Sequence, residues 1–336
     1  MIKKILNSNW KGILTVLNDM SKRSKRLRID LFIDMYNMYK KYGYTWLNYY
    51  TYNFDRVKNL EIRRTFLSQY GDNSKIYREF IKSPEIKYLQ DKIQFNKKFT
   101  KFLGREIINL EDNNLEEFKS FIRKNPIFFA KDPVLMGGKG VERVVYNENY
   151  DAYKLYERLL SEGKIILEQS VIQHPEMKKL SLNSLNTIRT GTAIDKDGNI
   201  SILYNVLRVS GNDSYLDNAS RGGYWTLLNE NGVIDKPLYR DLPKEDVIGI
   251  NPITKFNYMG FKIPYFEKVK ELAIQAASVC KDLKYVGWDI AITEKGPILI
   301  EGNDFPTTEL YQAHIHMEDG KGKVKLFEEK LGMKLR

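Results

Sequence analysis

The fold is decided by Gly287-Trp288-Asp289-Ile290-Ala291-Ile292-Thr293, followed after the turn Glu294-Lys295-Gly296 by Pro297-Ile298-Leu299-Ile300-Glu301-Gly302-Asn303. Two runs of apolar and polar residues around a short glycine-containing turn predict a β-hairpin. If the loop has three residues, Asp289 stands directly opposite Glu301 on the partner strand. We therefore expect two carboxylates side by side.

Two adjacent carboxylates repel each other unless a positive charge lies between them. Alternation along the strand places Asn303 on the same face as Glu301, and such oxygen atoms are the ligands that hard divalent cations prefer. The pattern predicts a metal site formed by Asp289, Glu301 and Asn303. The alternative is a solvated edge pair, but the apolar face formed by Trp288 and Ile290 argues against an edge. We expect removal of either carboxylate to leave the metal-free protein as stable or more stable.

A glycine-rich loop follows a predicted strand at Phe129-Ala130-Lys131. Gly137, Gly138 and Gly140 let backbone N–H groups approach phosphate oxygens, and a lysine at the strand end supplies charge. The loop is neither a Walker motif nor a dinucleotide fingerprint, because Gly140 follows Lys139 and the glycine spacing differs.

The 336 residues are 42% hydrophobic and 29% charged, which predicts roughly two domains with a full core. No apolar run approaches the ~20 residues that span a bilayer, so we expect a cytoplasmic protein. One cysteine and three histidines exclude an internal disulfide and a Cys/His zinc site. Cys280 ends an apolar helix face, where we expect it to be buried and unreactive.

The net charge is concentrated in residues 1–101, which hold 22 Lys and Arg against 9 Asp and Glu. Apolar residues between Ile2 and Leu17 predict a basic amphipathic helix, and further helices are expected at 27–41, 59–70 and 74–82. This region could contact an anionic membrane surface, a phosphorylated substrate, or a nucleic acid through the Lys, Arg and Tyr of residues 22–64. Its first helix could instead pack on its own domain. The simpler alternative is that Lys, Asn, Ile and Tyr are enriched together because of genome composition alone.

After Pro126 the pattern changes to short apolar runs, with strands expected at 127–130, 164–167, 186–194, 200–209, 285–292 and 298–300. Helices are expected at 149–161 and 264–283. Hairpin turns favour an antiparallel sheet, so the predicted class is α+β with a helical N-terminal region. We divide the chain into a basic helical region (1–88), a small subdomain with the glycine loop (89–167) and a large subdomain with the hairpin (168–336).

A further strand, Ile165-Ile166-Leu167-Glu168-Gln169-Ser170, ends in polar residues that could read an adenine ring. Residues 91–309 contain, in this order, a lysine, a lysine at a strand end, a glycine loop, a strand that ends in polar residues, a strand with an arginine, and the paired acids. In this order of elements they resemble the ATP-grasp superfamily. Asn186-Thr187-Ile188-Arg189, residues 218–223 and residues 287–303 are most similar to its sugar-transfer-associated branch. The basic helical region departs from the α/β domain usual in the superfamily.

The resemblance implies ATP and Mg²⁺ as cofactors and a role for each matching residue. Phosphate binding falls to Lys92 and Lys131, with Gly137, Gly138 and Gly140 in the loop that closes over the phosphates. Adenine contacts fall to Glu168, Gln169 and Ser170, and the ribose contact to His174 or Glu176. Arg189 would steady the transferred phosphoryl group, Arg208 and Arg221 would contact the acceptor, and Asp289, Glu301 and Asn303 would hold magnesium.

The implied reaction is ATP-dependent ligation of a carboxylate to an amine through an acyl phosphate. The family association suggests a small-molecule or glycan carboxylate, either a sugar acid or an amino acid, in the synthesis of a capsule or other surface polysaccharide. Phosphoryl transfer to a hydroxyl by an ATP-grasp kinase remains open. Binding of nucleic acid is the third reading, and it gives no reason for paired acids on a hairpin.

Overall fold

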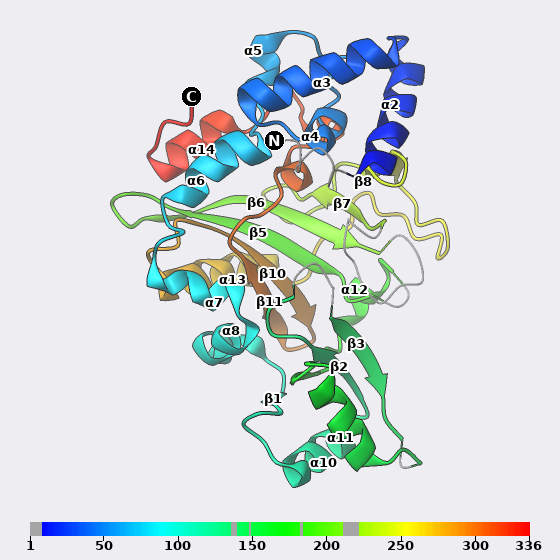
Figure 1. Ribbon diagram of the computed structural model, residues 1–336, viewed down its shortest axis with the longest axis vertical. Helices are drawn as coiled ribbons and strands as arrows, with labels where there is room; N and C mark the ends of the chain where they lie inside the picture. Colours follow the sequence, from blue (N-terminus) through cyan, green and yellow to red (C-terminus); the bar gives the residue numbers. More distant parts are fainter. Residues whose placement is uncertain (1–8, 136–139, 148, 182–183, 211–221) are drawn as a thin grey trace.

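The computed structural model describes residues 9–135, 140–147, 149–181, 184–210 and 222–336, and contains two antiparallel sheets and a layer of N-terminal helices (Figure 1). The N-terminal helices and the small sheet lie at opposite ends of the long axis, with the large sheet between them. The α+β class and the antiparallel pairing agree with the sequence analysis.

The N-terminal region begins with α2 (Trp10–Ser24), α3 (Arg28–Tyr42) and α4 (Trp46–Thr51). The side chain of Asn9 accepts a hydrogen bond from the Gly12 N–H and so caps α2, while Gly43 ends α3 with a positive φ of 79°. One face of each helix enters a common core that also contains Phe54 and Phe66. Shorter helical segments follow: α5 (Leu60–Arg63), the π-helix η1 (Gln69–Asn73), α6 (Ser74–Arg78), the 3₁₀ turn η2 (Pro84–Ile86), α7 (Lys87–Gln90), α8 (Lys92–Lys98) and α9 (Thr100–Leu103).

The small sheet has the strand order β1-β4-β2-β3. Its strands are β1 (Ile107–Asn109), β2 (Ile127–Lys131), β3 (Val141–Val145) and β4 (Ile166–Gln169). Helices α10 (Leu115–Lys124) and α11 (Ala152–Ser161) share a hydrophobic core with this sheet, which includes Phe118, Phe128 and Leu159.

The large sheet has the order β11-β10-β5-β6-β7-β8-β9. Its strands are β5 (Thr187–Ile194), β6 (Ile200–Val209), β7 (Tyr224–Leu227), β8 (Leu238–Arg240), β9 (Asp246–Ile248), β10 (Tyr285–Thr293) and β11 (Gly296–Asn303). α12 (Pro175–Lys178) precedes β5, α13 (Phe266–Val279) packs against β5, β6, β10 and β11, and α14 (Val324–Leu331) packs against β5 and β6. The 3₁₀ turns η4 (Thr308–Tyr311) and η5 (His314–His316) follow β11.

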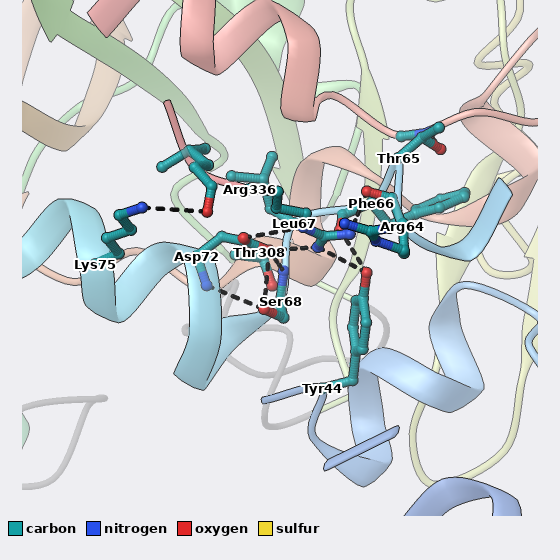
Figure 2. A network of polar contacts seen from close by, with 12 residues as sticks. Tyr44, Arg64, Thr65, Phe66, Leu67, Ser68, Asp72, Lys75, Thr308 and Arg336 are labelled. Atoms are coloured by element: carbon teal, nitrogen blue, oxygen red, sulfur yellow. Dashed lines mark hydrogen bonds and ion pairs between the residues drawn. The ribbon is translucent and has the colours of Figure 1, made fainter. Parts of the chain in front are cut away.

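Buried polar contacts join the N-terminal region to the rest of the protein. Arg336 donates to the Tyr44 hydroxyl at 2.8 Å and the Phe66 carbonyl at 2.7 Å, and it forms an ion pair with Asp72 (Figure 2). Near η4, the Asn48 amide donates to the Thr308 hydroxyl at 2.9 Å. The helices are therefore fixed to the body of the protein by specific directional bonds.

Several local predictions need correction. The predicted helix at 59–70 is only one turn, α5, because it ends in turn-type hydrogen bonds from Thr65 to Ile62 and from Phe66 to Arg63, and the π-helix η1 begins only at Gln69. Strands β1, β3, β7, β8 and β9, each of three to five residues, were not predicted. Residues 67–103 contribute to the core of the large sheet, although our division separates them at residue 88. The subdomain boundaries stay a prediction.

Candidate active site

The hairpin formed by β10 and β11 pairs Asp289 directly with Glu301, as the sequence indicated. The loop itself has two residues, not three, because Thr293 pairs with Gly296. A β-bulge between Asp289 and Ile290 restores the register, since one extra residue on β11 is accommodated there. Directly opposed residues of an antiparallel pair point to the same face, so the two carboxylates are neighbours.

Gly302 lies between Glu301 and Asn303, at a position where the neighbouring side chains leave no room for a Cβ atom. It pairs with Trp288, and a Cβ atom there would lie 2.9 Å from the indole ring and 2.6 Å from the Leu89 side chain. The buried Trp288 thus packs against the backbone of β11 on the face opposite the carboxylates. This packing fixes the strand that carries Glu301 and Asn303.

Two arginines hold Asp289. Arg189 is the Cα partner of Asp289 on β5, and its Nε and Nη2 atoms donate to the two carboxylate oxygens, the latter at 2.9 Å. Arg208 on β6 donates from Nη1 to Oδ2 at 2.8 Å. Burial alone would raise the pKa of Asp289, but these two cations hold it far below its usual range. Asp289 is therefore a carboxylate at neutral pH.

Glu301 and Asn303 lie at the more open end of the hairpin. The Glu301 side chain reaches solvent, although the surrounding atoms limit its hydration. This partial desolvation is the larger cause, and the nearby negative charge of Asp289 the second, that raises the pKa of Glu301 to about 7. The Asn303 amide donates to the Gly287 carbonyl at 3.2 Å, so its Oδ1 is the atom that could ligate a cation. Two carboxylates and one amide oxygen are a donor set that suits magnesium. Among the residues described, no group of three or more His, Cys, Asp or Glu forms a metal site.

The small sheet contributes a second charged cluster. Lys131, at the end of β2, forms an ion pair with Glu168 of β4 at 2.8 Å. Arg105 donates to the same carboxylate oxygen from Nε at 2.9 Å and Nη2 at 2.8 Å. Burial would raise the pKa of Glu168, but these two cations lower it to about 2. The carboxylate predicted to contact adenine thus has two cationic partners.

Arg105 was not found from the sequence, although it links the two sheets. Its Nη1 donates to the Leu299 carbonyl of β11 at 2.7 Å, while its Nε and Nη2 bind Glu168. Gly104, with φ of 58°, approaches Ile298 so closely that a Cβ atom would lie 2.3 Å from it. The Gly-Arg dipeptide just after a helical run was the available signal, but only the fold brings it to β11.

Lys92 begins α8 and lies against the segment that enters the glycine loop. Its ammonium donates to the backbone carbonyls of Asp132 at 3.0 Å, Pro133 at 3.4 Å and Leu135 at 2.5 Å. Burial lowers the pKa of Lys92, and the nearby charges of Glu301 and Lys131 act on it in opposite directions. Lys92 is thus within electrostatic reach of both clusters. Binding a phosphate would require it to exchange a carbonyl partner.

The predicted adenine and ribose residues lie along the connection from β4 to α12. Gln169 accepts a hydrogen bond from the Glu106 N–H at 3.1 Å, and Ser170 follows β4 half-buried. His174 caps α12 and donates from its backbone N–H to the Ile292 carbonyl at 2.7 Å, close to the hairpin turn. Glu176 forms an ion pair with Lys179 on the surface.

Three predicted residues, Gly137, Gly138 and Arg221, lie outside the described residues. Gly140 lies within them, and its φ of 69° requires glycine. Its carbonyl accepts a hydrogen bond from the Asp132 N–H at 3.1 Å, which closes the base of the loop beside Lys131. Cys280 is buried, and burial raises its thiol pKa to about 12, as expected for an unreactive cysteine.

The structure combines two antiparallel sheets, Lys131 at the end of β2, Lys92 at the start of α8 and the Asp289–Glu301 pair on the β10–β11 hairpin. These features agree with the ATP-grasp class of proteins. Residues 77–321 match the family described as sugar-transfer associated ATP-grasp, and the chain belongs to this family. A search of curated proteins gives no match.

Several solved structures are similar to this chain at low identity. D-alanyl-alanine synthetase A from Vibrio cholerae is 12% identical with a TM-score of 0.43, over 72% of this chain and 65% of that one. N5-carboxyaminoimidazole ribonucleotide synthetase from Thermotoga maritima is 12% identical with a TM-score of 0.40, over 71% of this chain and 50% of that one. The ATP-grasp ligase PsnB with its minimal precursor, Mg and ADP is 13% identical with a TM-score of 0.36, over 75% and 57%. This chain thus spans about half to two thirds of these proteins, and the family match carries the assignment.

Proposed function

We propose that this protein is an ATP- and Mg²⁺-dependent ligase that joins a carboxylate to an amine. The γ-phosphoryl group of ATP moves to a carboxylate oxygen of the acceptor and gives an acyl phosphate and ADP. The amine then attacks the acyl carbon, phosphate leaves, and the amine loses a proton as the amide forms. The family association supports a sugar acid or an amino acid of a surface polysaccharide as the carboxylate.

The observation that carries this proposal is the pairing of Asp289 with Glu301 beside a cluster of lysines and arginines. Lys92, Lys131, Arg105, Arg189 and Arg208 are five cationic side chains, against the three carboxylates Glu168, Asp289 and Glu301. An excess of positive charge suits a polyphosphate, and a paired carboxylate site suits the cation that accompanies it. A nucleotide with bound magnesium satisfies both halves of the site.

Asp289, Glu301 and Asn303 would hold magnesium, which neutralises phosphate charge when it is bound. Lys131 and Lys92 would orient the phosphates from the side of the small sheet. Arg189 is buried and fixed by Asp289, so it would stabilise charge on the transferred group without reorganisation. Orientation and charge neutralisation account for a site in which we assign no nucleophile.

The test is incubation of the pure protein with magnesium-ATP, candidate uronic acids and hydroxylamine, which traps acyl phosphates. Formation of a hydroxamate together with ADP supports the ligase. A stable phosphate ester on the acceptor would instead identify the protein as an ATP-grasp kinase. ADP formation that persists in Asp289→Asn would show that the activity comes from another site or a contaminant.

The reaction needs ATP, so the proposal includes a location in the cytoplasm. Nucleic-acid binding is the weaker alternative, because it leaves the paired acids without a role. A salt-sensitive shift of DNA that survives Asp289→Asn would favour it.

A further inference from the structure

Helix α3 exposes apolar side chains on the face that points away from the core. Ile29, Ile33 and Tyr36 are 60%, 50% and 40% exposed, and their spacing of four and three residues places them on one face of the helix. Leu31 and Met35, on the opposite side, are buried in the N-terminal core. The helix is thus apolar on both faces, although only one of them has a partner within the described residues.

Helix α2 extends this exposed face. Trp10 and Leu14, one turn apart, are 40% and 57% exposed. The Trp10 ring stacks on Phe32 of α3 with ring centroids 6.5 Å apart, so the outer sides of the two helices adjoin. Leu27, in the connection between the helices, is 68% exposed. We call the set the α2–α3 surface: Trp10, Leu14, Leu27, Ile29, Ile33 and Tyr36.

The same two helices expose an excess of positive charge. Of the eight Lys and Arg residues between 9 and 43, six are exposed: Lys11, Lys22, Lys25, Arg28, Lys40 and Lys41. The remaining two are used internally, because Arg23 pairs with Asp55 and Arg26 with Asp34. Asp30 is the one exposed carboxylate among the described residues of this segment. The segment around the apolar side chains is therefore cationic.

We propose that the α2–α3 surface docks on an anionic lipid membrane. Aliphatic side chains and a tryptophan enter the interface between head groups and acyl chains, while lysine and arginine pair with anionic head groups. A nucleic acid would match the charge but would leave Ile29, Ile33 and Leu27 without a contact. A second copy of the chain would bring two cationic surfaces together, which is unfavourable.

The position of the surface in the molecule fits this role. α2 and α3 lie at one end of the long axis, and the small sheet lies at the other (Figure 1). A membrane bound at the helical end leaves the β10–β11 hairpin and the end of β2 that carries Lys131 free to take up ATP. In the described part of the chain, no helix is long and apolar enough to span a bilayer, so the contact would be peripheral.

The test is sedimentation of the full-length protein with vesicles of phosphatidylcholine alone or of phosphatidylcholine mixed with phosphatidylglycerol. We expect binding only to the anionic vesicles, and release at high salt. Ile33→Ser should weaken binding about tenfold, because it removes a large apolar side chain from the interface. The double variant Arg28→Gln/Lys40→Gln should weaken it about 25-fold, since each cation near an acidic leaflet contributes about fivefold.

Matched controls lie on the body of the protein. Ile253 is 51% exposed in the connection between β9 and α13, so Ile253→Ser removes the same exposed apolar side chain as Ile33→Ser at a position outside α2 and α3. Lys154 and Lys281 are exposed as well, and Lys154→Gln/Lys281→Gln removes two charges. Neither control should change vesicle binding. None of these residues belongs to the candidate active site, so ATP consumption with a soluble substrate should be unchanged in all variants.

Three results would overturn the proposal. The first is a full-length protein that stays in the supernatant with anionic vesicles at low salt. The second is vesicle binding that Ile33→Ser and Ile253→Ser weaken equally. The third is a dimer in sedimentation velocity that Ile33→Ser dissociates, which would assign the surface to a second copy. Each outcome is independent of whether the enzyme proves to be a ligase.

Discussion

Arg105 and Glu168 form a buried ion pair that connects the two sheets across the candidate active site. The Arg105 side chain is 2% exposed and that of Glu168 is 7% exposed, and the same guanidinium donates to the Leu299 carbonyl of β11. The small sheet that carries Lys131 is thus tied directly to the hairpin that carries Glu301. The position of Lys131 relative to Glu301 therefore depends on Arg105, a residue that was not predicted as a ligand from the sequence.

We predict that Glu168→Gln lowers the free energy of unfolding by about 3 kcal/mol or more, because it leaves the buried Arg105 without its carboxylate. Glu142 is a matched control, since it also pairs with one arginine and one lysine, Arg158 and Lys164, but on the surface. Glu142→Gln should cost less than about 1 kcal/mol. Urea denaturation of the three proteins measures both. Equal losses would show that the Arg105 pair contributes no more than a surface pair.

The structure predicts different stabilities for two metal-site variants, Asp289→Asn and Glu301→Gln, for which the sequence alone predicts the same stability effect. Both Asp289→Asn and Glu301→Gln should abolish turnover in magnesium-ATP. Only Glu301→Gln should keep or raise the stability of the metal-free protein, because it removes the repulsion from Asp289. Asp289→Asn should lower it, since Arg189 and Arg208 would stay buried without a carboxylate. Thermal melts in the presence of a chelator test this. From the sequence alone, the metal-free protein is expected to be as stable or more stable in both variants. For Asp289→Asn the two arginine contacts lead us to expect a loss of stability instead.

Lys131→Met should weaken binding of an ATP analogue far more than Lys139→Met. Lys131 is held at a strand end by Glu168, so its charge is fixed toward the site. Lys139 lies outside the described residues, and the prediction for it rests on its place in the glycine-rich sequence. Calorimetric titration of both variants gives the two affinities. Small and equal losses would contradict the phosphate-binding role of the loop and its strand.

Two buried carboxyl groups, Glu309 and Asp241, should contribute more to stability at pH 6.5 than at pH 8. Burial raises the pKa of Glu309 to about 7 and that of Asp241 to about 6, and protonation of such groups favours the folded state. Their contribution is complete below the unfolded pKa and is lost as the pH rises through the folded one. Burial lowers the pKa of His314 and that of His316, the latter to about 4. Both residues therefore act in the opposite direction as the unfolded histidines begin to protonate above pH 6.5.

Glu309→Gln isolates this effect. Oε1 of Glu309 accepts from the Asn48 amide at 2.8 Å, and Oε2 has no hydrogen-bond partner among the described residues. Glutamine can keep the first bond and does not ionise, so the change in unfolding free energy between pH 8 and 6.5 should shrink by about 1 kcal/mol. Denaturant titrations at the two pH values measure the difference. An unchanged pH dependence would mean that Glu309 is not the group responsible.

Sequence reasoning succeeded where the signal was local and periodic. The pairing of Asp289 with Glu301 follows from alternation and a short turn. The predicted loop was one residue too long, but the pairing is still correct because a β-bulge adds one residue to β11. Strands β5 and β6 were recognised as long apolar runs. Strand β3 was missed, because its Val-Glu-Arg-Val-Val sequence is exposed on one side and reads as a polar connection.

By itself, the sequence determined the class of fold, the carboxylate pair and the strand-end lysine, because each depends on neighbours within one hairpin or one strand. Only the tertiary structure decided which charges meet. Arg105 reaches Glu168 across 63 positions and Arg189 reaches Asp289 across 100, and such contacts depend on how sheets and strands are placed in space. The same reason applies to the α2–α3 surface. Helical spacing predicts two apolar faces on α3, but packing against the N-terminal core decides which of them is left exposed.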